Sequence, residues 1–125
     1  MKANKTGFDR IVHATFNSMR GIATVWKYEA AFRQEALLCA ILLPVAFLIE
    51  ATLVERLLLI MTLFIVVITE LLNSAVEAVV DRVGAEFHEL SGRAKDIASA
   101  AVFFALVLMM VVWVAVLFRP AIFNL

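Results

Sequence analysis

The feature that most constrains this chain is an unbroken apolar segment near its C-terminal end. Residues 97–118 read IASAAVFFALVLMMVVWVAVLF and contain no charged side chain. As an α-helix that rises about 1.5 Å per residue, a segment of this length reaches across the hydrocarbon of a bilayer, which is about 30 Å thick. A single segment in lipid can pair its backbone polar groups only by forming a helix, so the segment predicts a transmembrane helix.

Two further segments are apolar enough to cross a membrane once their polar ends are included. Residues 36–49 are uncharged and flanked by Glu35 and Glu50, which we expect at the two interfaces. Residues 57–69 are also uncharged, and polar side chains begin at Glu70. The helix can continue past residue 69 if those polar side chains face protein. The sequence therefore predicts an all-α membrane protein with spans at about 30–49, 53–83 and 92–118.

Three residues bear on the ends and the shape of these spans. Gly84 predicts the end of the second span, since glycine commonly terminates helices. Ser91 is a weak candidate for the N-cap of the third span, because no Glu or Gln follows it at the spacing of a capping box. Pro44 lies inside the first span, where a proline removes one helical hydrogen bond and can kink the helix.

An amphipathic helix is predicted before the first span, over residues 6–27 or so. Its apolar side chains recur at three- and four-residue intervals, opposite a basic and polar face. A helix of this kind lies in the plane of the membrane surface, with its apolar face at the boundary between headgroups and acyl chains. The apolar positions are Phe8, Ile11, Val12, Phe16, Met19, Ile22, Ala23 and Trp26.

The distribution of basic residues predicts the orientation of the spans. Arg56 and Arg119 mark one side, whereas most of the other basic side chains precede the first span or lie near residues 84–96. Because cytoplasmic loops are enriched in Lys and Arg, we expect the N-terminus and residues 84–96 to be cytoplasmic and the C-terminus to be outside. The cytoplasmic set comprises Lys2, Lys5, Arg10, Arg20, Lys27, Arg33, Arg82, Arg93 and Lys95.

Composition argues against several classes of function. The 125 residues are 64% hydrophobic and carry 11 basic and 11 acidic side chains, so no net charge favours binding to nucleic acid. Cys39 is the single cysteine and has no disulfide partner in its own chain. His13 and His88 have no CxxC or HExxH companion, which argues against zinc.

A chain of this length forms one domain, residues 1–125, and buries little core by itself, so we expect self-association.

A line of polar side chains interrupts the second span. Glu70, Asn73, Glu77 and Asp81 fall within about 80° around the helix axis, so they form one narrow polar stripe. Ionisable groups at this depth mark an ion path or a catalytic site, or they join helices by hydrogen bonds to a neighbouring chain. The deeper Glu70 is the candidate general base, and Glu77, nearer the cytoplasm, suits Mg²⁺.

A second polar cluster lies at the start of the first span. Residues 28–36 read YEAAFRQEA, and Glu29 and Arg33 are one helical turn apart. This spacing is typical of an interfacial salt bridge with no catalytic role. Glu29 also lies near the expected depth of Glu77, which makes a metal site shared by the two carboxylates an alternative interpretation.

A third polar cluster opens the last span. Residues 88–99 read HELSGRAKDIAS, and Lys95 and Asp96 begin a helix whose N-terminal amides favour phosphate. Gly92 permits close approach of a ligand to the backbone. The same charges are also common on a helix that simply leaves the membrane. Since the sequence has no GxxxxGK[ST] loop and no kinase HRD or DFG element, any nucleotide chemistry would use a different scaffold.

Three segments together resemble the prokaryotic diacylglycerol kinase family: EAAFRQE (29–35), ELLNSAVEAVVDR (70–82) and HELSGRAKD (88–96). The resemblance extends over nearly the whole chain and includes three spans with a preceding surface helix. It implies ATP-dependent phosphorylation of the primary hydroxyl of diacylglycerol, which gives phosphatidic acid and ADP. It also implies a homotrimer of the cell inner membrane with sites shared between subunits.

The resemblance also implies roles for residues at matching positions. Glu70 would be the general base, and Asn73 would support the site. Glu29 and Glu77 would bind the Mg²⁺ that accompanies ATP. At Met19 the chain departs from the aromatic residues of the family pattern, as it does at position 17. The nucleotide would contact Arg10, Asn17, Glu29, Glu77, Glu86, His88, Lys95 and Asp96. The lipid would contact Arg10, Arg33, Gln34, Glu35, Glu70 and Ser99.

Two alternatives remain open from the sequence. An undecaprenol kinase of the same family would act on a different lipid alcohol, although AFRQE (31–35) favours the glycerolipid type. A non-catalytic membrane subunit would use its carboxylates only to join helices. Such a subunit would lose its oligomer, rather than turnover, in Glu77→Gln.

Overall fold

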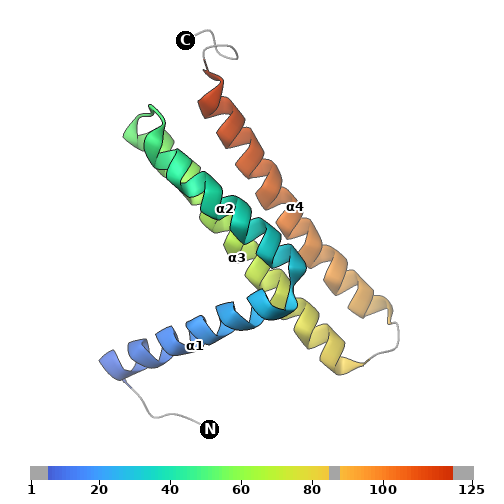
Figure 1. Ribbon diagram of the computed structural model, residues 1–125. Coiled ribbons are helices and arrows are strands. Elements are labelled where there is room, and N and C mark those ends of the chain that lie inside the picture. The colour runs from blue at the N-terminus through green and yellow to red at the C-terminus, as the bar shows by residue number, and fades with distance from the viewer. Residues whose placement is uncertain (1–5, 85–87, 120–125) are drawn as a thin grey trace.

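A computed structural model describes residues 6–84 and 88–119. Within these residues the chain forms four helices: α1 (Phe8–Tyr28), α2 (Ala30–Leu48), α3 (Leu53–Val83) and α4 (Glu89–Leu117). The helices α2, α3 and α4 form an elongated bundle, and α1 projects from it at a steep angle near one end (Figure 1). In the described part, α2, α3 and α4 are the helices long and apolar enough to cross a membrane, which confirms the predicted all-α plan with three candidate spans.

The surface helix α1 is amphipathic and barely attached to the bundle. Of its residues, all of which are described, Val25 alone is buried. The apolar side chains predicted to face lipid are exposed, among them Phe8, Ile11 and Phe16. An exposed apolar face is what a helix lying on a membrane surface requires.

A capping box and an arginine hold the short connection between α2 and α3. The Glu55 backbone N–H donates to Thr52 Oγ1 at 3.1 Å, and the Thr52 backbone N–H donates to Glu55 Oε1 at 2.9 Å. The sequence carries the signal for this cap, a threonine followed three residues later by a glutamate. The guanidinium of Arg56 donates to carbonyls at the end of α2 and in the turn, those of Ala46, Ile49 and Ala51.

The last span begins earlier than the sequence predicted. α4 starts at Glu89, because His88 is its N-cap and the Nδ1 atom of His88 accepts a hydrogen bond from the Leu90 backbone N–H at 3.1 Å. Ser91 therefore lies inside the helix, and the weak prediction of a cap there is wrong. The His88 imidazole can cap the helix because it accepts a hydrogen bond from one of the backbone N–H groups that every helix N-terminus leaves unpaired.

The other two spans are continuous helices. α2 runs unbroken through Pro44. α3 has 31 residues and ends at Val83, where Gly84 follows as predicted. At about 1.5 Å per residue, α3 is longer than the hydrocarbon of a bilayer is thick. One end of α3 therefore extends out of the apolar layer.

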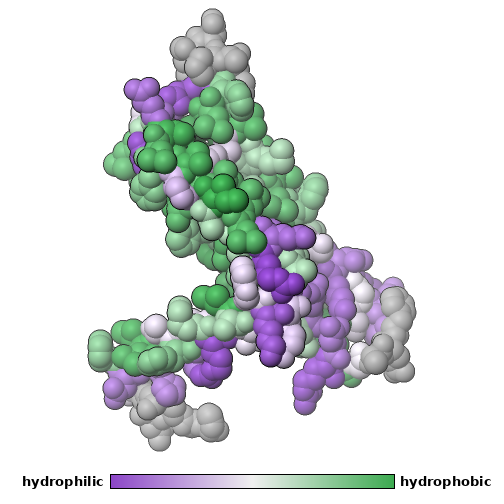
Figure 2. Space-filling view, in the orientation of Figure 1, coloured by the Kyte–Doolittle hydropathy of each residue, from purple (hydrophilic) through white to green (hydrophobic). Residues whose placement is uncertain are grey.

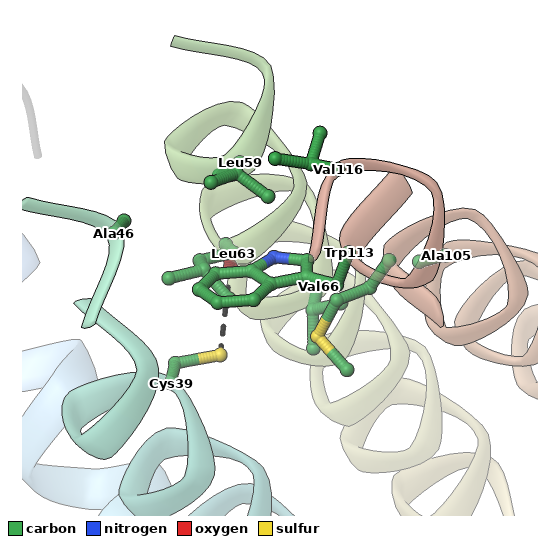
Figure 3. Close-up of a cluster of buried hydrophobic side chains, with 9 residues drawn as sticks. Cys39, Ala46, Leu59, Leu63, Val66, Ala105, Trp113 and Val116 are labelled. Carbon is green, nitrogen blue, oxygen red and sulfur yellow. Dashed lines mark hydrogen bonds between the residues drawn. The ribbon is translucent and has the colours of Figure 1, made fainter. Parts of the chain in front are cut away.

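The packed core lies mainly between α3 and α4. The Trp113 indole N–H donates to Thr62 Oγ1 at 3.1 Å, and the Thr62 hydroxyl donates to the Leu59 carbonyl at 2.7 Å. Figure 3 shows the Trp113 ring and the Cys39 thiol approaching Leu63 from different helices. The thiol donates to the Leu63 carbonyl across 3.7 Å. Polar groups in this core are thus paired within the protein, as a dry environment demands.

Polar and apolar surfaces are separated along the bundle. Apolar side chains cover the middle of the bundle, and hydrophilic side chains gather at the end where α1 joins, with a smaller group at the opposite end (Figure 2). Many large apolar side chains on the spans are exposed, including Phe47, Phe64 and Phe104. Lipid contact accounts for these exposed side chains, and the polar end is where the predicted site residues concentrate.

Candidate active site

The polar stripe on α3 is buried at its deep end and exposed at its shallow end. Glu70 is only 3% exposed, whereas the side chain of Asp81 is 66% exposed. Asn73 Nδ2 donates to Glu70 Oε2 at 3.4 Å, one turn along the same face. The stripe therefore leads from the polar end of the bundle to an acid group that solvent does not reach.

Glu35 of α2 lies against the buried end of the stripe. Its carboxyl group lies close enough to that of Glu70 for the two groups to interact. Within the described residues, Glu35 Oε1, Asn73 Oδ1 and Ser74 Oγ are buried without a hydrogen-bond partner. Buried polar atoms in native proteins nearly always have a partner. A cluster of such atoms around one acid group therefore marks a place where a ligand or another chain would bind.

Glu29 stands at the elbow between α1 and α2. It is the C-cap of α1 and the N-cap of α2, with an extended backbone at φ −120° and ψ 108°. Its carboxylate interacts electrostatically with that of Glu77 on α3. The two predicted metal ligands, which come from different parts of the chain, are thus close enough in the fold to interact electrostatically.

The donor set at this elbow fits Mg²⁺ accompanied by a phosphate ligand. No group of three or more His, Cys, Asp or Glu side chains in the described part of the chain could hold a metal ion alone. Mg²⁺ is commonly held by one or two carboxylates, with waters and substrate phosphates as the remaining ligands. Glu29 and Glu77 would supply the carboxylates of such a site.

Lys95 of α4 lies over the shallow end of the stripe. Its Nζ atom is 2.8 Å from Asp81 Oδ1, and it also interacts with Glu77. Asp81 belongs to the predicted stripe, but no sequence pattern pairs it with Lys95, because the two residues lie on different helices. The contact holds Lys95 as a cation beside the Glu77 carboxylate.

Arg33 does not form the salt bridge with Glu29 that the spacing predicted. Among the described residues, its Nη1 atom donates to the backbone carbonyls of Trp26 at 2.6 Å and Lys27 at 3.2 Å, at the end of α1. The prediction of a salt bridge is wrong, because the extended backbone at Glu29 breaks the regular helix that the one-turn spacing presumed. The exposed carbonyls at the end of α1 attract the guanidinium instead.

A cavity of about 750 Å³ lies between α1 and α3. Its walls are mainly apolar, and they include Glu29 at the elbow and Ser74, which neighbours the stripe on α3. The cavity has the size and the character of a site for a small molecule or part of a lipid. Its lining residues are Asn17, Ser18, Arg20, Gly21, Ile22, Thr24, Val25, Tyr28, Glu29, Leu71, Ser74, Ala75 and Ala78.

Several predicted nucleotide ligands lie away from this cluster or outside the described residues. Arg10 precedes Glu29 by 19 positions in the sequence, so the two are about 28 Å apart along α1. Asn17 lines the cavity and accepts a hydrogen bond from Arg20 at 2.8 Å. Glu86 lies outside the described residues. Two further predicted nucleotide ligands, His88 and Asp96, lie at the start of α4, as does Ser99, which was predicted to contact the lipid.

Comparison with known proteins decides the family. Residues 16–117 match the family model described as "Prokaryotic diacylglycerol kinase". The chain belongs to this family. The match includes every site residue that the sequence predicted except Arg10. Membership in the diacylglycerol kinase family, which the three sequence segments predicted, is thereby confirmed.

Curated members of the diacylglycerol kinase family are similar to the chain over most of their length. The diacylglycerol kinase of Escherichia coli (strain K12) is 47% identical over 113 residues, which cover 90% of this chain and 93% of that protein. Those of Haemophilus influenzae and Pseudomonas aeruginosa are 48% and 49% identical over 90% of this chain, and the alignments cover 96% and 92% of these relatives. The alignments thus cover most of this chain and most of each of these relatives.

Proposed function

We propose that the chain catalyses ATP-dependent phosphorylation of the primary hydroxyl of diacylglycerol, which gives phosphatidic acid and ADP. The observation that carries this proposal is the buried Glu70 carboxyl group at the inner end of a stripe that leads to two further carboxylates and a lysine. A lipid alcohol stays at the membrane interface and ATP stays in water, so the two can meet only where the apolar part of the bundle borders its polar end. The names of the similar proteins support diacylglycerol as the alcohol.

Glu70 would act as the general base. The lipid hydroxyl oxygen attacks the γ-phosphorus of ATP, the bond from this phosphorus to the bridging oxygen breaks, and ADP leaves. The hydroxyl proton passes to Glu70, whose carboxyl group Asn73 orients by a hydrogen bond and Glu35 adjoins. Phosphoryl transfer depends mainly on positioning and charge stabilisation, so orientation of this group matters more than its base strength.

Glu29 and Glu77 would bind the Mg²⁺ that accompanies ATP. When bound, Mg²⁺ supplies positive charge that neutralises the phosphoryl oxygens. Lys95 adds a second positive charge at this end of the stripe, and it would exchange its contact with Asp81 for one with a phosphate. The proposed nucleotide site is completed by Arg10, Asn17, Glu86, His88 and Asp96.

The mainly apolar cavity between α1 and α3 supports a lipid substrate. A diacylglycerol could place its glycerol end beside Glu70 and its acyl chains toward the membrane, with part of its apolar surface in the cavity. Gln34, Glu35 and Ser99 would border the headgroup. The exposed apolar face of α1 would keep this cavity at the level of the interface.

The proposed assembly is a homotrimer in the cell inner membrane, with the N-terminus and residues 84–96 cytoplasmic and the C-terminus outside. The separation between Arg10 and the elbow supports sites shared between copies, because about 28 Å along one helix is too far for both to hold the phosphates of one nucleotide. Arg10 of a neighbouring copy would supply the missing contact. The exposed apolar surface of the spans leaves ample room for such neighbours.

The test is transfer of labelled phosphate from ATP to diacylglycerol by the purified protein, compared with transfer to undecaprenol. We expect turnover of diacylglycerol in the presence of Mg²⁺ and a loss of about 10²–10⁴-fold in Glu70→Gln. Glu50→Gln is the matched control, because this exposed carboxylate lies at the opposite end of α2. An inactive wild-type protein, or full activity in Glu70→Gln, would reject the proposal.

A further inference from the structure

The direction of α1 depends on very few contacts. Val25 is its one buried residue, and a cavity separates much of α1 from α3. The chain turns sharply at Glu29, whose extended backbone joins α1 to α2. An element attached in this way can swing about its last residue unless something holds that end.

Arg33 holds that end from the first turn of α2. Its Nη1 atom lies 2.6 Å from the Trp26 carbonyl and 3.2 Å from the Lys27 carbonyl. The last carbonyls of a helix have no donors within the helix and carry the negative end of its dipole, so a guanidinium there is favoured in both geometry and charge. The Trp26 ring also packs edge-on against the buried Phe32 ring, with centroids 6.5 Å apart.

The contacts of Arg33 with the Trp26 and Lys27 carbonyls, which we call the clamp, join residues on the two sides of Glu29. Trp26 and Lys27 precede Glu29 in the sequence, Arg33 follows it, and the Arg33 backbone N–H donates to the Glu29 carbonyl at 3.2 Å. Because the Glu29 backbone joins the two helices, a change in the angle between them alters this backbone and redirects the Glu29 carboxylate relative to Glu77. The distance between these carboxylates decides whether they can bind one cation.

We propose that Arg33 is a positioning residue, which fixes the angle between α1 and α2 by binding the end of α1 and thereby holds Glu29 opposite Glu77. The family resemblance implied contact between Arg33 and the lipid, whereas this role acts through the metal-binding carboxylate. The inference rests on the proposed function, because it takes Glu29 and Glu77 as the ligands of Mg²⁺.

Kinetics distinguish the two roles of Arg33. In Arg33→Met we expect the Mg²⁺ concentration for half-maximal activity to rise about tenfold, while KM for diacylglycerol changes less than about twofold. Arg33→Lys, whose ammonium group can still reach a carbonyl, recovers part of the loss. Arg82→Met is the matched control for loss of one exposed cation and keeps the wild-type Mg²⁺ dependence. An effect of Arg33→Met confined to KM for diacylglycerol would overturn the proposal.

A distance measurement tests the clamp without using activity. Spin labels at Ala14→Cys on α1 and Val79→Cys on α3, in a Cys39→Ala background diluted with unlabelled protein, report the separation of these helices within one chain. We expect a narrow distribution of distances with Arg33 and a broad one with Arg33→Met. An unchanged distribution refutes the clamp. An inactive wild-type protein with the expected broadening would instead refute the proposed function and leave the clamp established.

Discussion

Replacing Thr62 with valine tests whether the buried bond between α3 and α4 stabilises the chain. Thr62 and Trp113 are 3% and 6% exposed, and the indole N–H has the threonine oxygen as its acceptor at 3.1 Å. Valine keeps the shape of threonine but removes this oxygen. The indole donor then remains buried without a partner, in a region where no water can take its place.

The expected loss follows from what each group retains. A buried donor left unpaired costs about 1–3 kcal/mol. Hydrogen bonds between helices in membrane proteins are weaker on average, about 0.6 kcal/mol with a maximum near 1.7. The bond from Thr62 to the Leu59 carbonyl adds little, since that carbonyl also has a helical donor. We therefore expect Thr62→Val to lower the free energy of unfolding by about 1–2 kcal/mol.

The assay is reversible unfolding by sodium dodecyl sulfate in mixed micelles, followed by circular dichroism. Thr69→Val is the matched control, because the Thr69 hydroxyl donates only to the Val66 carbonyl, at 3.0 Å, and accepts nothing from α4 among the described contacts. We expect it to cost less than about 0.5 kcal/mol. Equal losses for Thr62→Val and Thr69→Val would refute the reasoning, because they would show that the indole contact contributes nothing.

Three further predictions concern the site and the turn between α2 and α3. Glu35→Leu lowers kcat about tenfold more than Glu35→Gln, because only the amide can donate to Glu70; equal values in the labelled-ATP assay would contradict this. Asp81→Asn releases Lys95 for phosphate and lowers KM for ATP by less than about fivefold, since an ion pair this exposed is weak; a raised KM would contradict it. Thr52→Ala removes the N-cap of α3 and lowers the unfolding free energy by about 1 kcal/mol in the same detergent titration, and an unchanged midpoint would contradict it.

The sequence determined the spans, the stripe and the family. The uncharged run at 97–118 must form a helix in lipid, because a helix is the only single-segment structure that pairs its own backbone groups. The common face of Glu70, Asn73 and Glu77 follows from helical periodicity. Such features depend on neighbours along the chain, and for this reason they can be read without the fold.

Only the tertiary structure decided which side chains meet across helices. Glu35 against Glu70, Lys95 beside Asp81 and the indole of Trp113 on α3 are contacts between residues far apart in the sequence or on separate helices. Their formation depends on how the helices rotate and cross, which no local pattern specifies.

The elbow shows the same division at a single turn. Helical spacing predicted a salt bridge between Glu29 and Arg33, yet the backbone leaves the helix at Glu29, and Arg33 binds the end of α1 instead. Residue types and spacing determined that a cation and an acid would lie near this interface. The packing of α1 against α2 decided which atoms the cation reaches, because the unpaired carbonyls at a helix end exist only where the helix actually stops.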